Sequence, residues 1–453
     1  MNDRRSAADR NPLYYGAAKQ PRSRERYAAH PIPHRDGVPR GAGALGQPHS
    51  SSGEISLYVH IPFCASRCPY CDFATAPATS ALRSRYLDAL NTEIRNEGTA
   101  MGRPAARTLY VGGGTPSLLE PDEIRSLGAA LRESFDLGLV EATVEANPAT
   151  LDRARLEAWA GIGVTRLSLG AQSFSPQGLR QLGRTHQPED VAPAMHAARS
   201  LGLAVSLDLI FGWPGQSNQD WVEDLSRAIS LGPDHISCYP LELVLEPEES
   251  DANWPGGGWP TVRRWRERAG RTQPADDVVA RMYRTAERAL RGAGFAHYEI
   301  ANWALAGKRC EHNLVYWRNG EWLGLGTGAH SHLRVGRSRR PASLIAYLDA
   351  IDRGTPRIVD PEADEVSDTA MLALRLDEGL DLVAYGARFG HDAAGRVRAA
   401  LMSTAGLGLV RWSDDVARLT PRGRLLASEV FVRLLDEDDA PTSTERPGTL
   451  AAR

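Results

Sequence analysis

Short apolar runs and amphipathic stretches alternate along residues 55–240. The apolar runs have the length of strands, and the stretches between them carry apolar positions at helical spacing. Repeated strand-then-helix units build a parallel sheet with right-handed crossovers, so the sequence predicts an α/β fold. Six strands favour a partial (βα) barrel over a closed eight-fold barrel. The predicted strands are 56–61, 108–112, 142–145, 166–169, 204–210 and 235–239, and the predicted helices are 79–96, 121–134, 152–161, 188–201 and 218–231.

Residues 248–271 interrupt this alternation. The segment is rich in Gly, Pro, Trp and Arg, and we expect it to loop out of the barrel. Its tryptophans and arginines could hold a flat anionic ligand by stacking and charge, but a surface loop is the simpler interpretation. A helix predicted at 275–292 follows. We therefore place the barrel at residues 53–300, with 248–271 as an insertion.

The rest of the chain predicts a smaller second domain. After a linking segment at 301–360, two helices precede two short strands and a last helix. This order resembles a winged helix, and because the segment is not basic we expect a structural or lid role rather than DNA binding. Polar, aperiodic tails are predicted to be disordered. The second domain covers 361–435, with helices at 364–375, 392–404 and 421–435 and strands at 409–412 and 416–419, and the tails are 1–52 and 436–453.

Composition narrows the possible functions. The chain has 53 Lys and Arg against 56 Asp and Glu, and this net charge of −3 gives no overall basic field for nucleic acid. No apolar run reaches about 18 residues, so we expect no transmembrane segment. The first residues lack the pattern of a secretory leader. Five cysteines, three of them close together, favour a reducing, cytoplasmic compartment over a disulfide framework.

Three cysteines, Cys64, Cys68 and Cys71, directly follow the first predicted strand. Three thiolates on one loop can hold three of the four irons of a cubane cluster, which leaves one iron open to a ligand. Zinc is the alternative, but structural zinc needs a fourth protein ligand. Cys238 and Cys310 stand alone and lack the spacing of a second ligand pair.

The Cys-x3-Cys-x2-Cys spacing after the first strand of a partial barrel resembles the radical S-adenosylmethionine (SAM) superfamily. That resemblance implies a [4Fe-4S] cluster whose open iron binds SAM and whose electron cleaves it. The longer strings Leu57–Cys64 and Cys71-Asp72-Phe73 resemble the oxygen-independent coproporphyrinogen III oxidases and, within that group, the HemW-type haem chaperones. The oxidases carry a further cysteine where Phe73 stands, so the resemblance favours a chaperone.

The same resemblance implies a set of SAM contacts at the ends of later strands. Gly113, Gly114 and Thr115 match the glycine motif that holds the SAM amino group, and successive glycines let the backbone approach a ligand. Glu145 matches a glutamate that contacts SAM, where a carboxylate could accept hydrogen bonds from the ribose. Asp208 lies within an apolar strand, where a buried charge needs a partner, and Arg184 could supply one. The remaining implied contacts are Tyr58, Tyr70, Gln172, Arg184 and Asp208.

The string His312-Asn-x2-Tyr316-Trp317 resembles the marker motif of HemW-type proteins. Imidazole is a common axial ligand of haem iron, so His312 is a candidate ligand, with Tyr316 and Trp317 as porphyrin contacts. A hydrogen-bonded structural histidine is the alternative. The lesser ligand candidates are His330, His332 and Cys310.

The resemblance therefore implies a chaperone that binds haem and passes it to an acceptor haemoprotein. A low-potential electron donor, such as flavodoxin or ferredoxin, is the second implied partner. One alternative is an oxidase-like enzyme that decarboxylates propionate side chains with a deoxyadenosyl radical. Another is a zinc-binding structural protein, which leaves the glycines and acidic residues at the strand ends without a role.

Overall fold

The computed structural model describes residues 53–243, 253–254, 259–354, 356–361 and 363–435. Both predicted disordered tails, and most of the first half of the predicted insertion, lie outside these residues. Within them, no helix is both long enough and apolar enough to cross a membrane.

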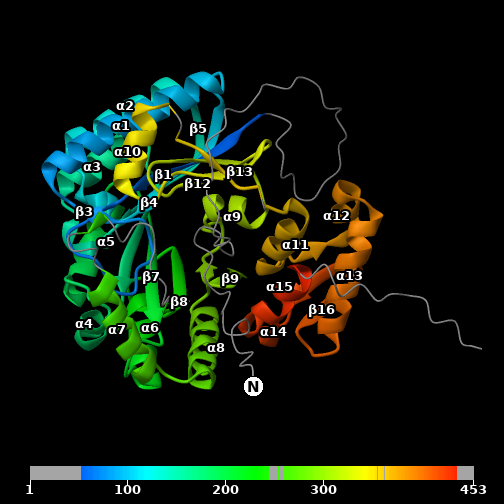
Figure 1. The fold of residues 1–453 in the computed structure, drawn as a ribbon. Coiled ribbons are helices and arrows are strands. Elements are labelled where there is room, and N and C mark those ends of the chain that lie inside the picture. The colour runs from blue at the N-terminus through cyan, green and yellow to red at the C-terminus, as the bar shows by residue number, and fades with distance from the viewer. Residues whose placement is uncertain (1–52, 244–252, 255–258, 355, 362, 436–453) are drawn as a thin grey trace, which may run out of the picture.

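A twelve-stranded sheet forms the larger domain (Figure 1). Its centre consists of six parallel strands in the order of the chain, and each contains a predicted strand. The partial barrel that was predicted from the alternation of apolar runs and helical stretches is thus confirmed. These strands are β1 (Ile55–Ile61), β4 (Ala105–Gly113), β5 (Asp136–Ala146), β6 (Arg166–Gln172), β7 (Ala204–Phe211) and β8 (His235–Pro240).

Further strands extend both edges of the sheet and leave it open. Beside β1 the first added strand, β11 (Trp322–Leu325), is parallel, and the next ones are antiparallel. Beside β8 the two added strands are antiparallel. These edge strands are β12 (His330–Leu333), β13 (Gly336–Arg339) and β14 (Ile358–Val359) on one side, and β10 (Asn302–Ala304) and β9 (Ala296–Glu299) on the other.

Helices cover the outer face of the barrel (Figure 1). Their starts follow local capping: the Asp152 side chain accepts from the Arg155 amide and the Ser217 side chain from the Asp220 amide. Two of these helices, α4 (Pro176–Gln181) and α10 (Leu344–Asp352), were not predicted. The others are α1 (Ser80–Ala100), α2 (Pro121–Ser134), α3 (Arg153–Gly161), α5 (Val191–Ser200), α6 (Asn218–Ser230) and α8 (Asp276–Gly292).

The expectation that residues 248–271 loop out is wrong for their second half. Residues Trp259–Thr272 form a helix, α7. Val262, Trp265, Arg266 and Ala269 recur at helical spacing on its covered face. Only three of these four are apolar, and the fourth is an arginine, so the helical pattern is hard to recognise in the sequence.

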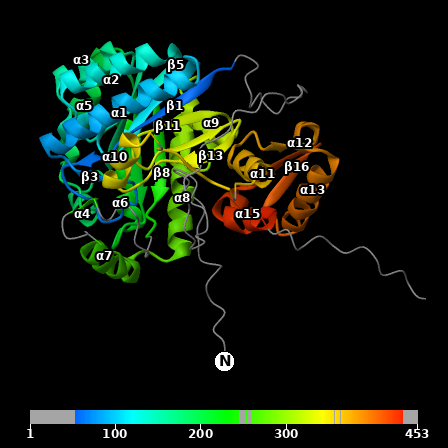
Figure 2. The same cartoon turned by 45° about the horizontal axis from the view of Figure 1, so that its top comes forward.

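The second domain packs beside the barrel (Figure 2). It has its own apolar core, and the predicted order of helices, two short strands and a last helical segment is observed. A helix and a short strand were missed, and the last helix is divided in two. The elements are α11 (Glu365–Arg375), β15 (Leu380–Asp381), α12 (Leu382–Phe389), α13 (His391–Ala405), β16 (Val410–Ser413), β17 (Val416–Leu419), α14 (Pro421–Leu425) and α15 (Ala427–Leu435).

Candidate cluster-binding site

The three cysteines lie on a loop that begins where β1 ends. Two short strands, β2 (Phe63–Cys64) and β3 (Ala76–Pro77), pair in parallel and close this loop at its base. Within it, the Cys71 amide donates to the Cys68 carbonyl at 3.0 Å. All three thiols are free and half-buried. Burial raises the pKa of Cys64 to about 11 and also raises the pKa of Cys71, so these two thiols need a positive partner to become thiolates.

The arrangement fits a cubane better than a single zinc ion. In the described residues, no three His, Cys, Asp or Glu side chains converge on one point. A cubane does not require convergence, because each thiolate binds a different iron. The cysteine loop therefore supplies a suitable donor set for three irons, and the residues that the structure describes supply no fourth ligand for zinc at this place.

The glycine turn after β4 packs directly against the cysteine loop. The Gly114 amide donates to Ile61 O, and the Thr115 amide to Phe63 O, both at 2.8 Å. A Cβ on Gly114 would lie 2.6 Å from the Pro62 carbonyl, and one on Gly113, where φ is +113°, would lie 2.4 Å from the His60 ring. Both glycines are needed for this close approach.

Glu145 is the next-to-last residue of β5 and contacts that turn. Its two carboxylate oxygens accept hydrogen bonds from the Gly113 amide at 2.9 Å and from the Tyr110 hydroxyl at 2.8 Å. Burial raises the pKa of Glu145 to about 7, although the two hydrogen bonds lower it. The nearby Asp208 also raises this pKa. The carboxyl group is therefore poised to ionise when a cationic ligand binds.

Arg184 reaches the cysteine loop from the segment after α4. Its guanidinium donates to the Cys68 sulfur at 3.6 Å and to the Gly170 carbonyl at 3.2 Å. Its Nε is buried and has no partner among the described residues. Gln172 lies nearby in the left-handed region, with φ +63°, a conformation that costs a non-glycine residue energy. An unpaired donor beside strained backbone fits an anionic ligand group such as a carboxylate.

Asp208 and Arg184 form no direct ion pair, although the positive charge of Arg184 lowers the pKa of Asp208. Asp208 instead accepts a hydrogen bond from the Ser168 hydroxyl at 3.0 Å. Burial raises the pKa of Asp208, while the hydroxyls of Ser237 and Ser168 oppose this. Neutral hydroxyls on neighbouring strands thus satisfy the carboxyl group.

Two tyrosines and a histidine complete the surroundings of the loop. The Tyr58 hydroxyl lies 3.0 Å from His60 Nδ1, and His60 Nε2 lies 2.7 Å from the Ala74 carbonyl. His60 thus connects β1 to the end of the cysteine loop, a role that the sequence did not reveal. Tyr70 packs against a small apolar cluster that includes Trp213.

His312 lies on α9 (Glu311–Trp317), which packs against the barrel strands β4 and β5. Its Nδ1 lies 2.7 Å from the Thr108 hydroxyl, whose own proton goes to Ser56. Its Nε2 lies 2.7 Å from the Tyr316 hydroxyl. The ring therefore carries its proton on Nδ1 and accepts at Nε2. Both nitrogens are engaged, so Tyr316 must move before the Nε2 of His312 can bind iron.

The other proposed haem contacts do not gather around His312. Trp317 lies under Arg375 of the second domain, with the guanidinium 4.2 Å from its ring. Cys310 is buried and donates to Glu141 at 3.3 Å. The His332 Nδ1 lies 2.9 Å from the Gly320 carbonyl, whereas His330 is half-buried and its ring makes no hydrogen bond within the described residues.

Comparisons with known proteins agree with this geometry. A sequence profile of the Radical SAM superfamily matches residues 58–228, and one of the HemN C-terminal domain matches 360–426. The chain is 37% identical to the heme chaperone HemW of Mycobacterium tuberculosis H37Rv, over 88% of this chain and 97% of the relative. This chain belongs to the HemW family of the radical SAM superfamily. The Bacillus subtilis HemW is 33% identical, over 84% and 99% of the two chains.

The fold of the HemW family member described here is also that of a solved structure. The coproporphyrinogen III oxidase HemN of Escherichia coli superimposes with a TM-score of 0.71 at 23% identity, over 84% of this chain and 90% of HemN. Membership of the radical SAM superfamily implies a [4Fe-4S] cluster and SAM. Cys64, Cys68 and Cys71 lie within the matched region, as does the glycine turn.

Proposed function

We propose that this protein is a haem chaperone, which takes up haem and passes it to an acceptor haemoprotein. Relatives named heme chaperone HemW align with it over nearly their whole length, and this is the observation that carries the proposal. Phe73 adds support, because it stands where the oxidases carry a further cysteine. The likeness to HemN, at 23% identity, supports a common fold but not a common reaction.

The cysteine loop is the proposed cluster site, with one iron on each of Cys64, Cys68 and Cys71. When bound, the cluster supplies one electron for the cleavage of SAM. Around it, Arg184 offers its unpaired Nε to an anionic group and Glu145 offers a carboxylate to the cationic ligand. The glycine turn provides close backbone contact, and Tyr58, Tyr70, Gln172 and Asp208 are proposed to line the pocket.

The implied partners and compartment follow from this proposal. Reduction of the cluster requires a low-potential donor, such as flavodoxin or ferredoxin, and delivery requires an acceptor haemoprotein. A cluster held by free thiols is stable in the reducing cytoplasm, which we propose as the location. The helical second domain, next to α9, is proposed to have a structural or lid role.

Substitution of single cysteines tests the cluster site. Cys64→Ala, Cys68→Ala or Cys71→Ala should each abolish the iron–sulfur absorption after anaerobic reconstitution, because one corner of the cubane loses its ligand. Cys238→Ala is the matched control, since this buried cysteine lies on β8, and it should leave the absorption intact. Stoichiometric zinc without iron in the reconstituted wild-type protein would contradict the assignment.

Titration with haem tests whether the protein binds haem. The reconstituted protein should bind haem with a shift of the Soret band that saturates at a fixed stoichiometry. A spectrum that remains the sum of free haem and protein throughout the titration would refute the chaperone function.

A further inference from the structure

The helix α7 has two chemically distinct faces. Val262, Trp265, Arg266 and Ala269 form its covered face. Its exposed face carries four arginines and one glutamate, a net charge of +3 on a chain whose total is −3. The exposed charged residues, called here the α7 basic face, are Arg263, Arg264, Glu267, Arg268 and Arg271.

The covered face of α7 holds the cysteine loop. Arg266 is fully buried, and its guanidinium donates to the Pro69 and Cys71 carbonyls, both at 2.9 Å. Trp265 packs against the same small apolar cluster as Tyr70 of the loop. The outer face of α7 is thus separated from the cysteine loop by the thickness of one helix, about 10 Å.

The glutamate of the basic face neutralises little of it. Glu267 pairs with Arg263 at 2.8 Å, and its backbone carbonyl accepts from the Arg271 side chain. Both members of the pair are largely exposed, at 59% and 42%, so water screens the interaction and Arg263 keeps its attraction for a partner.

We propose that the α7 basic face is the docking surface for an acidic one-electron carrier protein. The inference rests on the proposed function, because it requires a cluster in the cysteine loop. In the step that docking permits, the carrier loses one electron and the cluster gains it, and no bond forms or breaks. A positive surface attracts an acidic carrier over long range and orients it toward the nearest redox centre.

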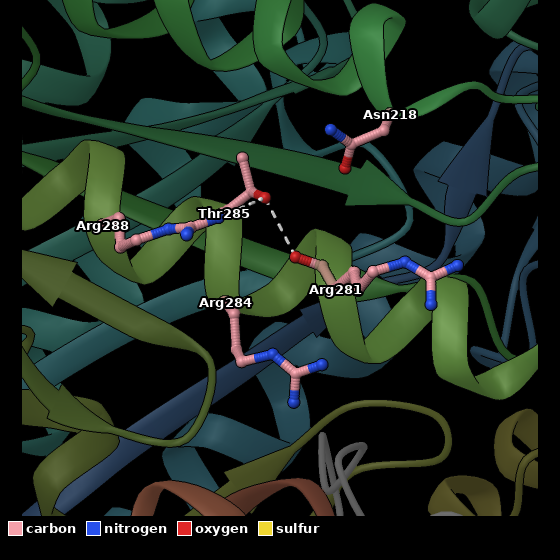
Figure 3. A pocket seen from close by; sticks show the side chains of 5 residues that line it. All are labelled: Asn218, Arg281, Arg284, Thr285 and Arg288. Atoms are coloured by element: carbon pink, nitrogen blue, oxygen red, sulfur yellow. Dashed lines mark hydrogen bonds between the residues drawn. The ribbon is translucent and has the colours of Figure 1, made fainter.

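A second group of arginines is less suited to this role. Arg281, Arg284 and Arg288 line a surface pocket of about 390 Å³ with Asn218 and Thr285 (Figure 3). They belong to α8, which packs against α6 and β8. No hydrogen bond joins α8 to the cysteine loop among the described residues. A carrier bound there would not have the short path for the electron through α7 to the cysteine loop.

The test compares three triple variants of the full-length, reconstituted protein. The first, Arg263→Gln with Arg268→Gln and Arg271→Gln, removes charge from the basic face and retains helix-forming residues. The control, Arg125→Gln with Arg132→Gln and Arg153→Gln, removes the same charge from α2 and α3, which lie at the opposite end of the barrel in both views (Figures 1 and 2). The third replaces Arg281, Arg284 and Arg288 by Gln.

Cluster reduction is followed by stopped-flow absorbance, with dithionite and with reduced flavodoxin, a small acidic flavoprotein. We expect the first variant to lose about 10-fold or more in its second-order rate with flavodoxin at low salt. Its rate should also depend less on salt, and the amount of cluster reduced by dithionite should be unchanged. The control variant should react like the wild type.

Two results would overturn the proposal. One is an unchanged flavodoxin rate in the first variant, and the other is a larger loss in the α8 variant. A wild-type protein with no cluster that dithionite can reduce would instead contradict the proposed function itself, and the docking surface with it.

Discussion

His312 and Asp208 show what a sequence reveals about single residues and what it does not. Both were recognised as unusual from their neighbours in the chain, but their hydrogen-bond partners come from other strands or another turn of the helix. Asp208 accepts a hydrogen bond from Ser168, and Arg184 acts on it only through its charge, without an ion pair. His312 is held by Thr108, which is distant in sequence, and by Tyr316. Residue type was therefore predictable, whereas partner and protonation depend on tertiary contacts.

Glu145 should make SAM binding dependent on pH. Burial raises the pKa of Glu145 from 4.5 to about 7. Between these two pH values the buried carboxyl group keeps a proton that a carboxyl group in water has lost. A cationic ligand favours the ionised form, so binding should release a proton near pH 6.5, and affinity should rise with pH through about 7 and then level off. Calorimetry in buffers of different ionisation enthalpy measures this release.

Glu145→Gln is the matched variant for that measurement, because it keeps the size of the side chain but cannot ionise. It should bind SAM without proton release. Equal affinity of the wild type at pH 6 and pH 8, or proton release that persists in the variant, would count against the role of Glu145.

His312 and His330 should respond differently to alanine. Loss of the His312 ring leaves the Tyr316 hydroxyl without its acceptor, which costs roughly 1–3 kcal/mol, and removes one of the two hydrogen bonds of Thr108, which keeps its bond to Ser56. We therefore expect His312→Ala to lower the unfolding midpoint. His330→Ala removes no hydrogen bond within the described residues and should leave that midpoint nearly unchanged.

The haem spectra of the two variants identify the ligand. If His312 is the axial ligand, only His312→Ala changes the ligand field, and Tyr316 must release the Nε2 of His312 on binding. If the available ring of His330 is the ligand, only His330→Ala changes it. A spectrum that neither variant alters would exclude both and direct attention to Cys310 and His332.

Some strands and helices can be predicted from the sequence more readily than others. The six central strands are apolar runs and were predictable. β11 was not, because it is four residues long and Gly324 lies within it. α7 was missed because an arginine occupies its covered face, and burial of Arg266 depends on carbonyls of the cysteine loop.

A side chain added in the glycine turn should also disrupt cluster binding by the cysteine loop. A valine at Gly114 would place its Cβ 2.6 Å from the Pro62 carbonyl and 2.8 Å from that of Phe63, and backbone cannot yield without moving the loop. We expect Gly114→Val to lose at least half of the iron–sulfur absorbance, and not only affinity for SAM. Gly138→Val is the control, since no atom lies within 4 Å of its Cβ. Full cluster content in Gly114→Val would show that the two segments are not coupled.

Helix α9 connects the apolar core of the barrel to that of the second domain. The motif His312-Asn-x2-Tyr316-Trp317 places one side chain against the barrel strands and another against the second domain. Arg375, above Trp317, also pairs with Glu299 at 3.4 Å. Both domains could be predicted from periodicity, but their junction could not, because it is a small apolar cluster assembled from segments that are distant in sequence.

Trp317→Ala should therefore loosen the junction. Removal of a large buried aromatic ring costs about 3–5 kcal/mol, and here it also removes the surface under Arg375. Hydrogen exchange in α11 should become faster, while exchange in β4 and β5 should remain slow. Trp412→Ala is the control, because Trp412 also carries an arginine, Arg398, over its ring but lies within the second domain. Unchanged exchange in α11 of Trp317→Ala would contradict this role of α9.

The assay for coproporphyrinogen III decarboxylation tests the central claim most directly. The sample is the anaerobically reconstituted wild-type protein, supplied with SAM and a reductant, after haem binding has been measured on the same preparation. A chaperone with Phe73 in place of the further cysteine should release no carbon dioxide from coproporphyrinogen III, although it binds haem. Measurable decarboxylation would contradict the account and assign the protein to the oxidases.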